Sequence, residues 1–178
     1  MEQMGDDILF YYSGSRDARV GEGVHEYVRN VNNYAQLSQA RDWRKVLSNF
    51  YEHHFYWLGH WYNTAEHAYQ AAKFENINHN LAFQFTLDSG TQLSQSPGIE
   101  ARKLRKVVQM NQHQISQWNS ISEVTMESIL VAKFSSSQQL GNVLLYTCNA
   151  QLWHGGPRIP ARRMVELERV REMLRNGT

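Results

Sequence analysis

Apolar and polar positions along the chain predict a few short strands among several helices. Residues 8–13, ILFYYS, are rich in β-branched and aromatic side chains, which is typical of a strand. The segment 53–63, HHFYWLGHWYN, contains few helix-forming residues. Its glycine at position 59 predicts a turn between one or two further short strands. Residues 13–23, SGSRDARVGEG, are polar and glycine-containing and are expected to form a loop.

A helix over about residues 65–77 is predicted to begin after Thr64, whose hydroxyl suits an N-cap. One face of this helix carries small or apolar residues at helical spacing: Ala65, Ala68, Tyr69 and Ala72. A second face carries polar residues at i, i+4 and i+7: Glu66, Gln70 and Lys73. Packing of the alanine face against the protein body would hold Glu66, in the first turn, beside the aromatic segment that precedes it.

Further helices are predicted near Ile99, after a cap at Ser122, over residues 138–147 and over residues 161–175. Glycine and proline predict loops at residues 88–98 and 154–160. The pattern predicts an α+β fold: a single compact, predominantly helical domain with a small β-sheet. We expect it to span residues 1–178, with a core of about residues 8–175.

Composition limits the classes of function. The chain of 178 residues has a net charge of +1, so nucleic-acid binding would depend on a local patch rather than on a basic field. Its single cysteine, Cys148, lies in an apolar run and favours a small core residue over a nucleophile, and it fits a reducing compartment. No segment approaches the roughly 18 uninterrupted apolar residues of a membrane span, and no secretory signal precedes the first strand. These features predict a soluble intracellular protein, in the cytoplasm or the nucleus.

The segment 43–74 combines many aromatic residues with polar ones, which is unusual for a core and typical of a lined pocket. Glu66 is its best candidate for chemistry, and plain helix capping is the alternative. Lys45 lies between Trp43 and Leu47, where apolar surroundings would favour a neutral, nucleophilic amine, whereas a surface lysine is the alternative. For Lys73 the two interpretations are phosphate pairing and a solvated helix face.

Two other candidates have strong competing interpretations. Trp118 suits either core packing or base stacking. The histidines at positions 53, 54, 60 and 67 invite a metal site, but neither an HExxH nor a CxxC motif accompanies them. We therefore expect no metal and no cofactor.

Several motifs together resemble the NADAR family. They are LSNFY at 47–51, NTAEHAYQAAKF at 63–74, IEARKLRK at 99–106, QW at 117–118, AKF at 132–134 and LLYTCNAQLWH at 144–154. The opening segment and DWRKVLSNF resemble the branch of this family found in eukaryotes and large viruses. The resemblance covers roughly residues 8–175. It implies an N-glycosidase acting on ribosylated compounds related to NAD and ADP-ribose, with a compact, mostly helical α+β fold.

The resemblance also implies site residues. Family functional positions correspond to Asn49, with Ser48 and Phe50 in the same motif, to Glu66 and to Trp118. Some members use a lysine that forms an adduct with the ring-opened ribose, and Lys45 is the candidate. Several bacterial members have an aspartate near the C-terminal end, where this chain reads LWHGGPRIPARRM without an acidic residue. His154 or Arg158 would take its place, which favours a phosphate-bearing ADP-ribosyl substrate.

These considerations predict a hydrolase that removes ADP-ribose from guanine, most simply on DNA bound through a local patch. Glu66 would stabilise the positive charge that develops on the ribose, and Lys45 would attack the opened sugar. The remaining predicted binding residues would stack on bases or contact the ribose hydroxyls and the pyrophosphate: Asn49, Phe50, Trp61, Trp118, Arg19, Gly21, Gly23 and Arg158. The alternatives are a non-catalytic module that binds ADP-ribose or NAD, an N-glycosidase acting on a ribosylated riboflavin-pathway intermediate, and a scaffold with aromatic residues at a partner interface.

Overall fold

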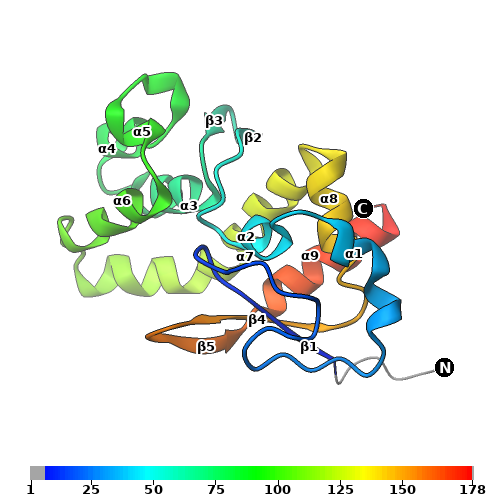
Figure 1. The fold of residues 1–178 in the computed structure, drawn as a ribbon. Helices are drawn as coiled ribbons and strands as arrows, with labels where there is room; N and C mark the ends of the chain where they lie inside the picture. The colour runs from blue at the N-terminus through cyan, green and yellow to red at the C-terminus, as the bar shows by residue number, and fades with distance from the viewer. Residues whose placement is uncertain (1–6, 178) are drawn as a thin grey trace. The chain divides into compact units, whose positions relative to one another are not determined.

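A computed structural model describes residues 7–177 and contains many helices with two small sheets (Figure 1), as the predicted α+β class requires. Contacts within the chain group it into two compact units. Unit 1 comprises Met1–Ser48 and Ser137–Thr178, and unit 2 comprises Asn49–Ser136. The single domain expected over residues 1–178 stays a prediction.

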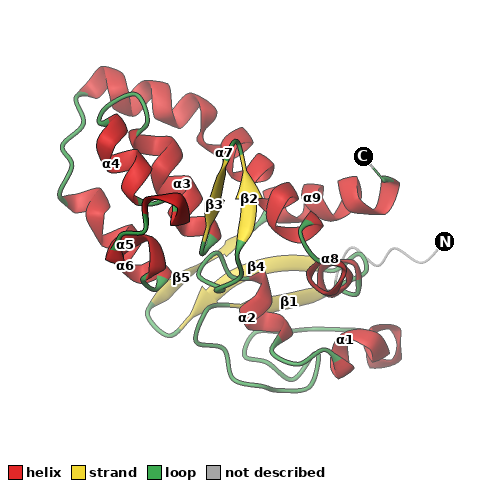
Figure 2. Ribbon diagram, turned by 90° about the horizontal axis from the view of Figure 1, so that it is seen from above, coloured by secondary structure: helices red, strands yellow, loops and turns green. Residues whose placement is uncertain are grey.

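Unit 1 is built on a three-stranded sheet whose strands run in the order β1 (Ile8–Tyr11), β4 (Gln151–Gly156), β5 (Ile159–Arg163) (Figure 2). β1 pairs with β4 in parallel, with Leu9 opposite Leu152, and β5 pairs with β4 in an antiparallel hairpin. Leu9 and Leu152 are fully buried, because α2 (Trp43–Leu47) packs against β1 and α9 (Val165–Asn176) packs against β4. The predicted first strand is confirmed.

The other helices of unit 1 complete its core. They are the 3-10 helix η2 (Val31–Tyr34), α1 (Ala35–Gln39) and α8 (Gln138–Leu145). α8 packs against both α2 and α9. Their apolar faces bury Tyr34, Leu37 and Leu144 completely, so most of the free energy that stabilises this unit comes from apolar burial.

Unit 2 contains a two-stranded hairpin made of β2 (Phe55–Trp57) and β3 (His60–Tyr62). The two turn residues, Leu58 and Gly59, both have positive φ, 44° and 92° respectively. Positive φ at both central positions is the signature of the tight turn that matches strand twist. The predicted turn at Gly59 is confirmed.

Helix α3 (Ala65–Phe74) lies at the centre of unit 2. It packs against α4 (His79–Gln84), α6 (Gly98–Lys103) and α7 (Gln112–Ser135). The Thr64 hydroxyl accepts a hydrogen bond from the backbone N–H of His67 at 3.2 Å, so the predicted N-cap is confirmed. The remaining helices are η3 (Leu87–Ser89), α5 (Gln92–Gln95) and η4 (Leu104–Lys106).

Several predicted boundaries are wrong. The loop predicted at 88–98 contains α5, and the helix predicted over 65–77 ends at Phe74. Helix α7 begins after Asn111, not after Ser122, because Asn111 and Gln114 form a reciprocal capping box. Trp118 therefore lies inside this helix. The predicted loop at 154–160 contains the ends of β4 and β5, and the last helix begins at Val165 because residues 159–163 pair with β4.

Candidate functional site

The first turn of α3 fixes the position of Glu66. Its backbone N–H donates a hydrogen bond to the carbonyl of Asn49 at 3.1 Å. The motif around Asn49 is thereby tied to the helix that carries the acid, within unit 2. A carboxylate in this turn also interacts favourably with the helix dipole.

The Glu66 side chain is buried, since the residue is only 8% exposed. Burial raises the pKa of the Glu66 carboxyl, while a hydrogen bond from Gln70 Nε2 to Glu66 Oε1, 2.7 Å long, opposes the rise. Glu66 therefore holds a proton more readily than an exposed glutamate does. Such a group can serve as a general acid and, once deprotonated, as a negative charge beside the substrate.

Three cations surround this buried acid. Lys73 lies about two turns from Glu66 along the same face of α3. Arg102 and Arg105 belong to α6 and η4. All three lower the pKa of Glu66 through their charge, although less strongly than burial raises it. Burial and the charge of Arg105 lower the pKa of Lys73 in turn. The cluster therefore combines one carboxyl of raised pKa with groups that attract phosphate.

Gln70 adds an unsatisfied acceptor to this cluster. Gln70 is 2% exposed, and among residues 7–177 its Oε1 atom has no hydrogen-bond partner. A buried amide oxygen without a donor costs free energy, so such an atom in a folded protein needs an explanation.

Aromatic side chains adjoin the same helices. Trp118 is 8% exposed and meets the Tyr69 ring edge to face, with their centroids 5.0 Å apart. Phe50 packs so closely on Gly98 that a Cβ atom there would lie 2.7 Å from its ring. The geometry of Trp118 agrees with core packing, and its role in base stacking stays a prediction.

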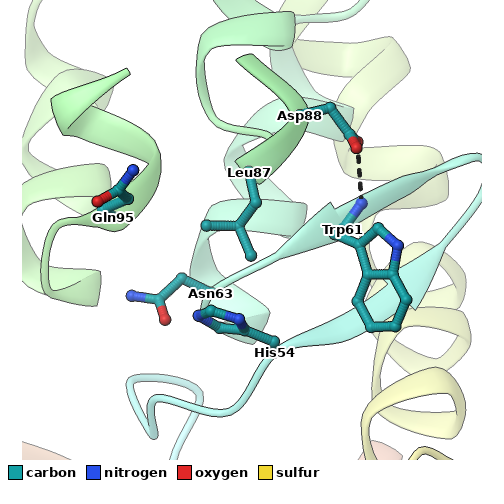
Figure 3. A pocket seen from close by; sticks show the side chains of 6 residues that line it. All are labelled: His54, Trp61, Asn63, Leu87, Asp88 and Gln95. Carbon is teal, nitrogen blue, oxygen red and sulfur yellow. Dashed lines mark hydrogen bonds between the residues drawn. The ribbon is translucent and has the colours of Figure 1, made fainter. Parts of the chain in front are cut away.

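Trp61 lies elsewhere in unit 2, at a shallow pocket of about 510 Å³ that Figure 3 shows. Its backbone N–H donates to Asp88 Oδ2 at 3.1 Å, and its ring remains 48% exposed. Polar side chains of the same pocket are His54, Asn63 and Gln95. An exposed indole beside amide groups suits stacking and hydrogen bonding with a planar ring.

Lys133 in α7 is a candidate that sequence analysis missed. It is 1% exposed, and its Nζ atom lies 4.8 Å from the centre of the Phe134 ring and 5.8 Å from that of Tyr51. Burial lowers the pKa of Lys133 to about 7, so about half of its amine is neutral at pH 7. The helical spacing held the signal, because Lys133 follows Met126, Ile129 and Leu130 by seven, four and three residues.

Lys45 does not have the apolar surroundings that the sequence suggested. Its side chain is 44% exposed, and its Nζ atom lies 3.7 Å from the Asp42 carboxylate. The neighbouring Ser48, in contrast, is 2% exposed and forms the C-cap of α2. Lys45 is therefore a partly exposed, ion-paired side chain and is not enclosed by apolar groups.

The predicted pyrophosphate loop of unit 1 uses its own donors internally. The backbone N–H groups of Gly21 and Gly23 donate to Glu26 Oε1 at 3.1 and 3.0 Å. The carbonyl of Arg19 accepts a hydrogen bond from Arg44. These two glycine amides are therefore unavailable to a pyrophosphate in this conformation, whereas the exposed side chain of Arg19 can still reach a ligand.

His154 and Arg158 lie at the β4–β5 hairpin of unit 1. The His154 ring meets the Tyr11 ring edge to face, with their centroids 5.5 Å apart. Arg158 is exposed and has a positive φ of 62° in the turn. Contact of either residue with a substrate stays a prediction.

Other sequence features bear less directly on chemistry. Within residues 7–177, no group of three or more histidine, cysteine, aspartate or glutamate side chains could hold a metal ion. Cys148 is partly exposed, and burial raises the pKa of its thiol, which disfavours the thiolate. The described part of the chain has no helix long and apolar enough to cross a membrane.

Comparisons with known proteins identify relatives of this fold. The chain has no match among curated proteins. It is similar to the E. coli protein YbiA, whose NMR structure superposes with a TM-score of 0.62 at 23% sequence identity, over 98% of this chain and 88% of that one. The family model described as the NADAR domain matches residues 30–158. Because this match covers well over half of the sequence, the chain belongs to the NADAR family.

Proposed function

We propose that the chain is an N-glycosidase that removes ADP-ribose from guanine, most simply guanine in DNA. Membership of the NADAR family, which is associated with glycosidase activity, supports the general reaction. The observation that carries the proposal is the buried Glu66 carboxyl with Gln70, Lys73, Arg102 and Arg105 around it.

The cluster suits cleavage of a sugar–base bond that lies close to phosphate groups. As the bond between ribose C1 and the base nitrogen breaks, positive charge develops on the sugar and negative charge on the base. Protonated Glu66 can donate its proton to the leaving base, and its carboxylate then stabilises the sugar cation until water adds to C1. The cations would hold the phosphates.

A lysine that forms an adduct with the opened ribose would be Lys133 rather than Lys45. Only a neutral amine attacks an aldehyde, and the pKa of about 7 leaves about half of Lys133 neutral at pH 7. Its charge also lowers the pKa of His53, so it lies close to the segment that follows Asn49 and Phe50. Borohydride reduction during turnover should trap the adduct on native protein and on Lys45→Arg. If Lys133→Arg forms as much trapped adduct as native protein does, Lys133 is not the lysine that reacts.

The proposed reaction is tested with an oligonucleotide that carries one ADP-ribosylated guanine. Mass spectrometry should detect free ADP-ribose together with the unmodified oligonucleotide. Glu66→Gln should lose turnover while it still binds the substrate, because the amide keeps the size and the contact with Gln70. The matched control is Glu75→Gln, an exposed acid at the other end of α3, which should keep native turnover.

The outcomes separate an enzyme from a binding module. If native protein binds the modified oligonucleotide but leaves it intact, the chain is a non-catalytic module that binds ADP-ribose and not a hydrolase. Full turnover by Glu66→Gln would show that Glu66 takes no part in the reaction. Release of sugar from free ribosylated bases but not from the oligonucleotide would reject DNA as the substrate.

A positive surface on α6 and η4 supports a nucleic-acid substrate. It consists of four cations within five residues: Arg102, Lys103, Arg105 and Lys106. Lys106 is exposed, so Lys106→Gln should remove one phosphate contact without disturbing the core. We expect it to weaken oligonucleotide binding and to reduce the slope of log affinity against log salt by about 1. An unchanged slope would show that DNA does not cross this surface.

A further inference from the structure

The shallow pocket of unit 2 beside Trp61 has features of a ligand site that the reaction at Glu66 does not use. Its volume of about 510 Å³ is within the range of small-molecule sites. It lies between the β2–β3 hairpin and the segment 87–95, and the side chains that line it are those of His54, Trp61, Asn63, Leu87, Asp88 and Gln95 (Figure 3). An indole and an aliphatic side chain beside several polar groups suit a flat ring that also makes hydrogen bonds.

The outer face of the hairpin exposes aromatic rings that do not contribute to the core. Tyr56 and Trp61 are cross-strand partners with their ring centroids 5.7 Å apart, and they are 55% and 48% exposed. The core of the hairpin is supplied by its opposite face, where Phe55, Trp57 and Tyr62 are buried. The exposed indole at the pocket is therefore free to serve as a stacking surface for a nucleobase.

A fixed carboxylate gives the pocket a chemical preference. Asp88 Oδ2 accepts a hydrogen bond from the backbone N–H of Trp61 at 3.1 Å, and it lies 2.9 Å from His60 Nδ1. These two contacts lower the pKa of Asp88, so its carboxyl is ionised at neutral pH. The Asp88 side chain is 40% exposed, so a ligand can reach it. Because an ionised carboxylate only accepts hydrogen bonds, it selects a ligand that carries donors.

Guanine matches this preference better than the other bases do. Its pairing edge carries two neighbouring donors, N1–H and the N2 amino group, whereas each other base has a single donor group there. A charge-assisted hydrogen bond is about twice as strong as a neutral one, so Asp88 outweighs the neutral amides of Asn63 and Gln95 in selecting the base. Asn63 Nδ2 donates one hydrogen to the carbonyl of Ser96 at 3.1 Å, and its second hydrogen can donate to guanine O6.

The positive surface of unit 2 begins on the segment that follows this pocket. Gln95 ends α5, and α6, which packs against α5, begins at Gly98 and carries Arg102 and Lys103. The cations continue in η4. A strand whose phosphates bind there would carry its neighbouring bases past the pocket. Cations for the backbone together with an aromatic ring for a base are the usual means by which proteins bind single strands.

We infer that this pocket binds an unpaired guanine of a DNA strand, with the base stacked on Trp61 and its pairing edge toward Asp88. In a duplex this edge faces cytosine, so only a single strand can present it. The inference goes beyond the reaction proposed at Glu66, because the guanine bound here carries no ADP-ribose. The two proposals share only the positive surface on α6 and η4.

The test measures the affinity of the full chain for fluorescent oligonucleotides of about eight nucleotides, by anisotropy in about 50 mM salt. The strands are unmodified oligothymidines, either with one central guanine, with hypoxanthine in its place, or with thymine throughout. Hypoxanthine differs from guanine only by lacking the N2 amino group, so this comparison changes no protein residue. Native protein should bind the guanine strand about tenfold more tightly than the hypoxanthine strand, the effect of about one charge-assisted hydrogen bond.

Two variants connect the effect to the pocket, and each has a matched control. Asp88→Asn keeps the size of the side chain but loses its charge, so it should bind the guanine and hypoxanthine strands within about twofold of each other. Its control is Glu75→Gln, an exposed acid of the same unit that does not line the pocket, which should keep the native preference. Trp61→Leu should weaken binding of the guanine strand about tenfold through loss of stacking. Its control is Tyr56→Leu, which removes an exposed ring of the same hairpin outside the pocket lining and should bind like native protein.

Each other outcome overturns the inference. Equal binding of all three strands by native protein, or no binding up to about 1 mM protein, would mean that unit 2 has no guanine site. A native preference for guanine in Asp88→Asn, or equal losses in Tyr56→Leu and Trp61→Leu, would place the base outside the pocket. Equally tight binding of the duplex form would show that the pairing edge is not recognised. Because these strands carry no ADP-ribose, their affinities do not depend on glycosidase activity, so failure here is distinguishable from failure of the proposed function.

Discussion

Replacing Lys133 by methionine should make the protein more stable at neutral pH. Methionine keeps a long unbranched side chain against Tyr51 and Phe134 and removes the amine, which is 1% exposed. Burial lowers the pKa of Lys133 from 10.5 to about 7. One pKa unit corresponds to about 1.4 kcal/mol, so holding this lysine in the fold costs roughly 4 kcal/mol at pH 7. Loss of the polar contacts of Nζ reduces the gain, and we expect a net stabilisation of roughly 2 kcal/mol or more.

The pH dependence gives the sharper signature. Between pH 7 and 10.5 the unfolded lysine is protonated and the native one is largely neutral, so the unfolded state binds more protons. The free energy of unfolding of the native protein should therefore rise with pH through this window, by up to about 1.4 kcal/mol per pH unit, relative to Lys133→Met. The stability advantage of the variant should be largest below pH 7 and should vanish as pH approaches 10.5.

Urea unfolding at several pH values between 6 and 9 measures both effects. Lys106→Met, which replaces an exposed lysine, is the matched control and should follow the native protein at every pH. A Lys133→Met variant that is less stable than native protein at pH 7, or whose stability changes with pH in parallel with it, would refute the burial argument. If Lys133 also forms the proposed adduct, the more stable variant should be inactive, an exchange of stability for function that is common at active sites.

Three further changes probe other parts of the structure. Glu26→Gln leaves the Arg44 guanidinium buried without a counter-charge, and should lower the free energy of unfolding by about 3–5 kcal/mol in urea titrations; a loss below about 1 kcal/mol would contradict the role of this pair. Asn111→Ala should cost about 1 kcal/mol because it removes the cap of α7, and an equal cost for Ser122→Ala would argue that the helix starts later. Glu66→Gln should be more stable than native protein at pH 7, since burial raises the pKa of Glu66 and penalises its ionised form. That difference should shrink as pH falls through the raised pKa of Glu66 toward the ordinary carboxyl range, and a gain that persists unchanged at pH 4 would exclude ionisation as its cause.

Local signals were sufficient for several elements. Thr64 caps α3 as its hydroxyl predicts, and Gly59 forms the hairpin turn because it adopts positive φ without strain. The spacing of Glu66, Gln70 and Lys73 placed them on one helix face, and the structure brings charges from α6 and η4 to the same face. The cap, the turn and the shared helix face depend on residues close in sequence, so a linear pattern records them, whereas the approach of α6 and η4 depends on the fold.

The pattern of apolar and polar residues did not predict the elements that depend on pairing between distant segments of the chain. Strand β5 contains Ala161, Arg162 and Arg163, and its residues are exposed, so no apolar alternation marks it. Its hydrogen bonds with β4 determine its conformation, and this pairing also delays the start of the last helix to Val165. The capping box of Asn111 and Gln114 is present in the sequence, but the predicted helix began after Ser122 instead.

The sequence by itself determined the helical character of the chain, the cap and polar face of α3, the hairpin and the family motifs, because each depends on neighbours within a turn or two. Only the tertiary structure decided which charged groups are buried. Lys45 proved exposed, whereas Lys133, Glu26 and Arg44 proved buried. Desolvation depends on every segment that packs around a side chain, and those segments come from distant parts of the chain, so the chemistry of these groups is a property of the fold.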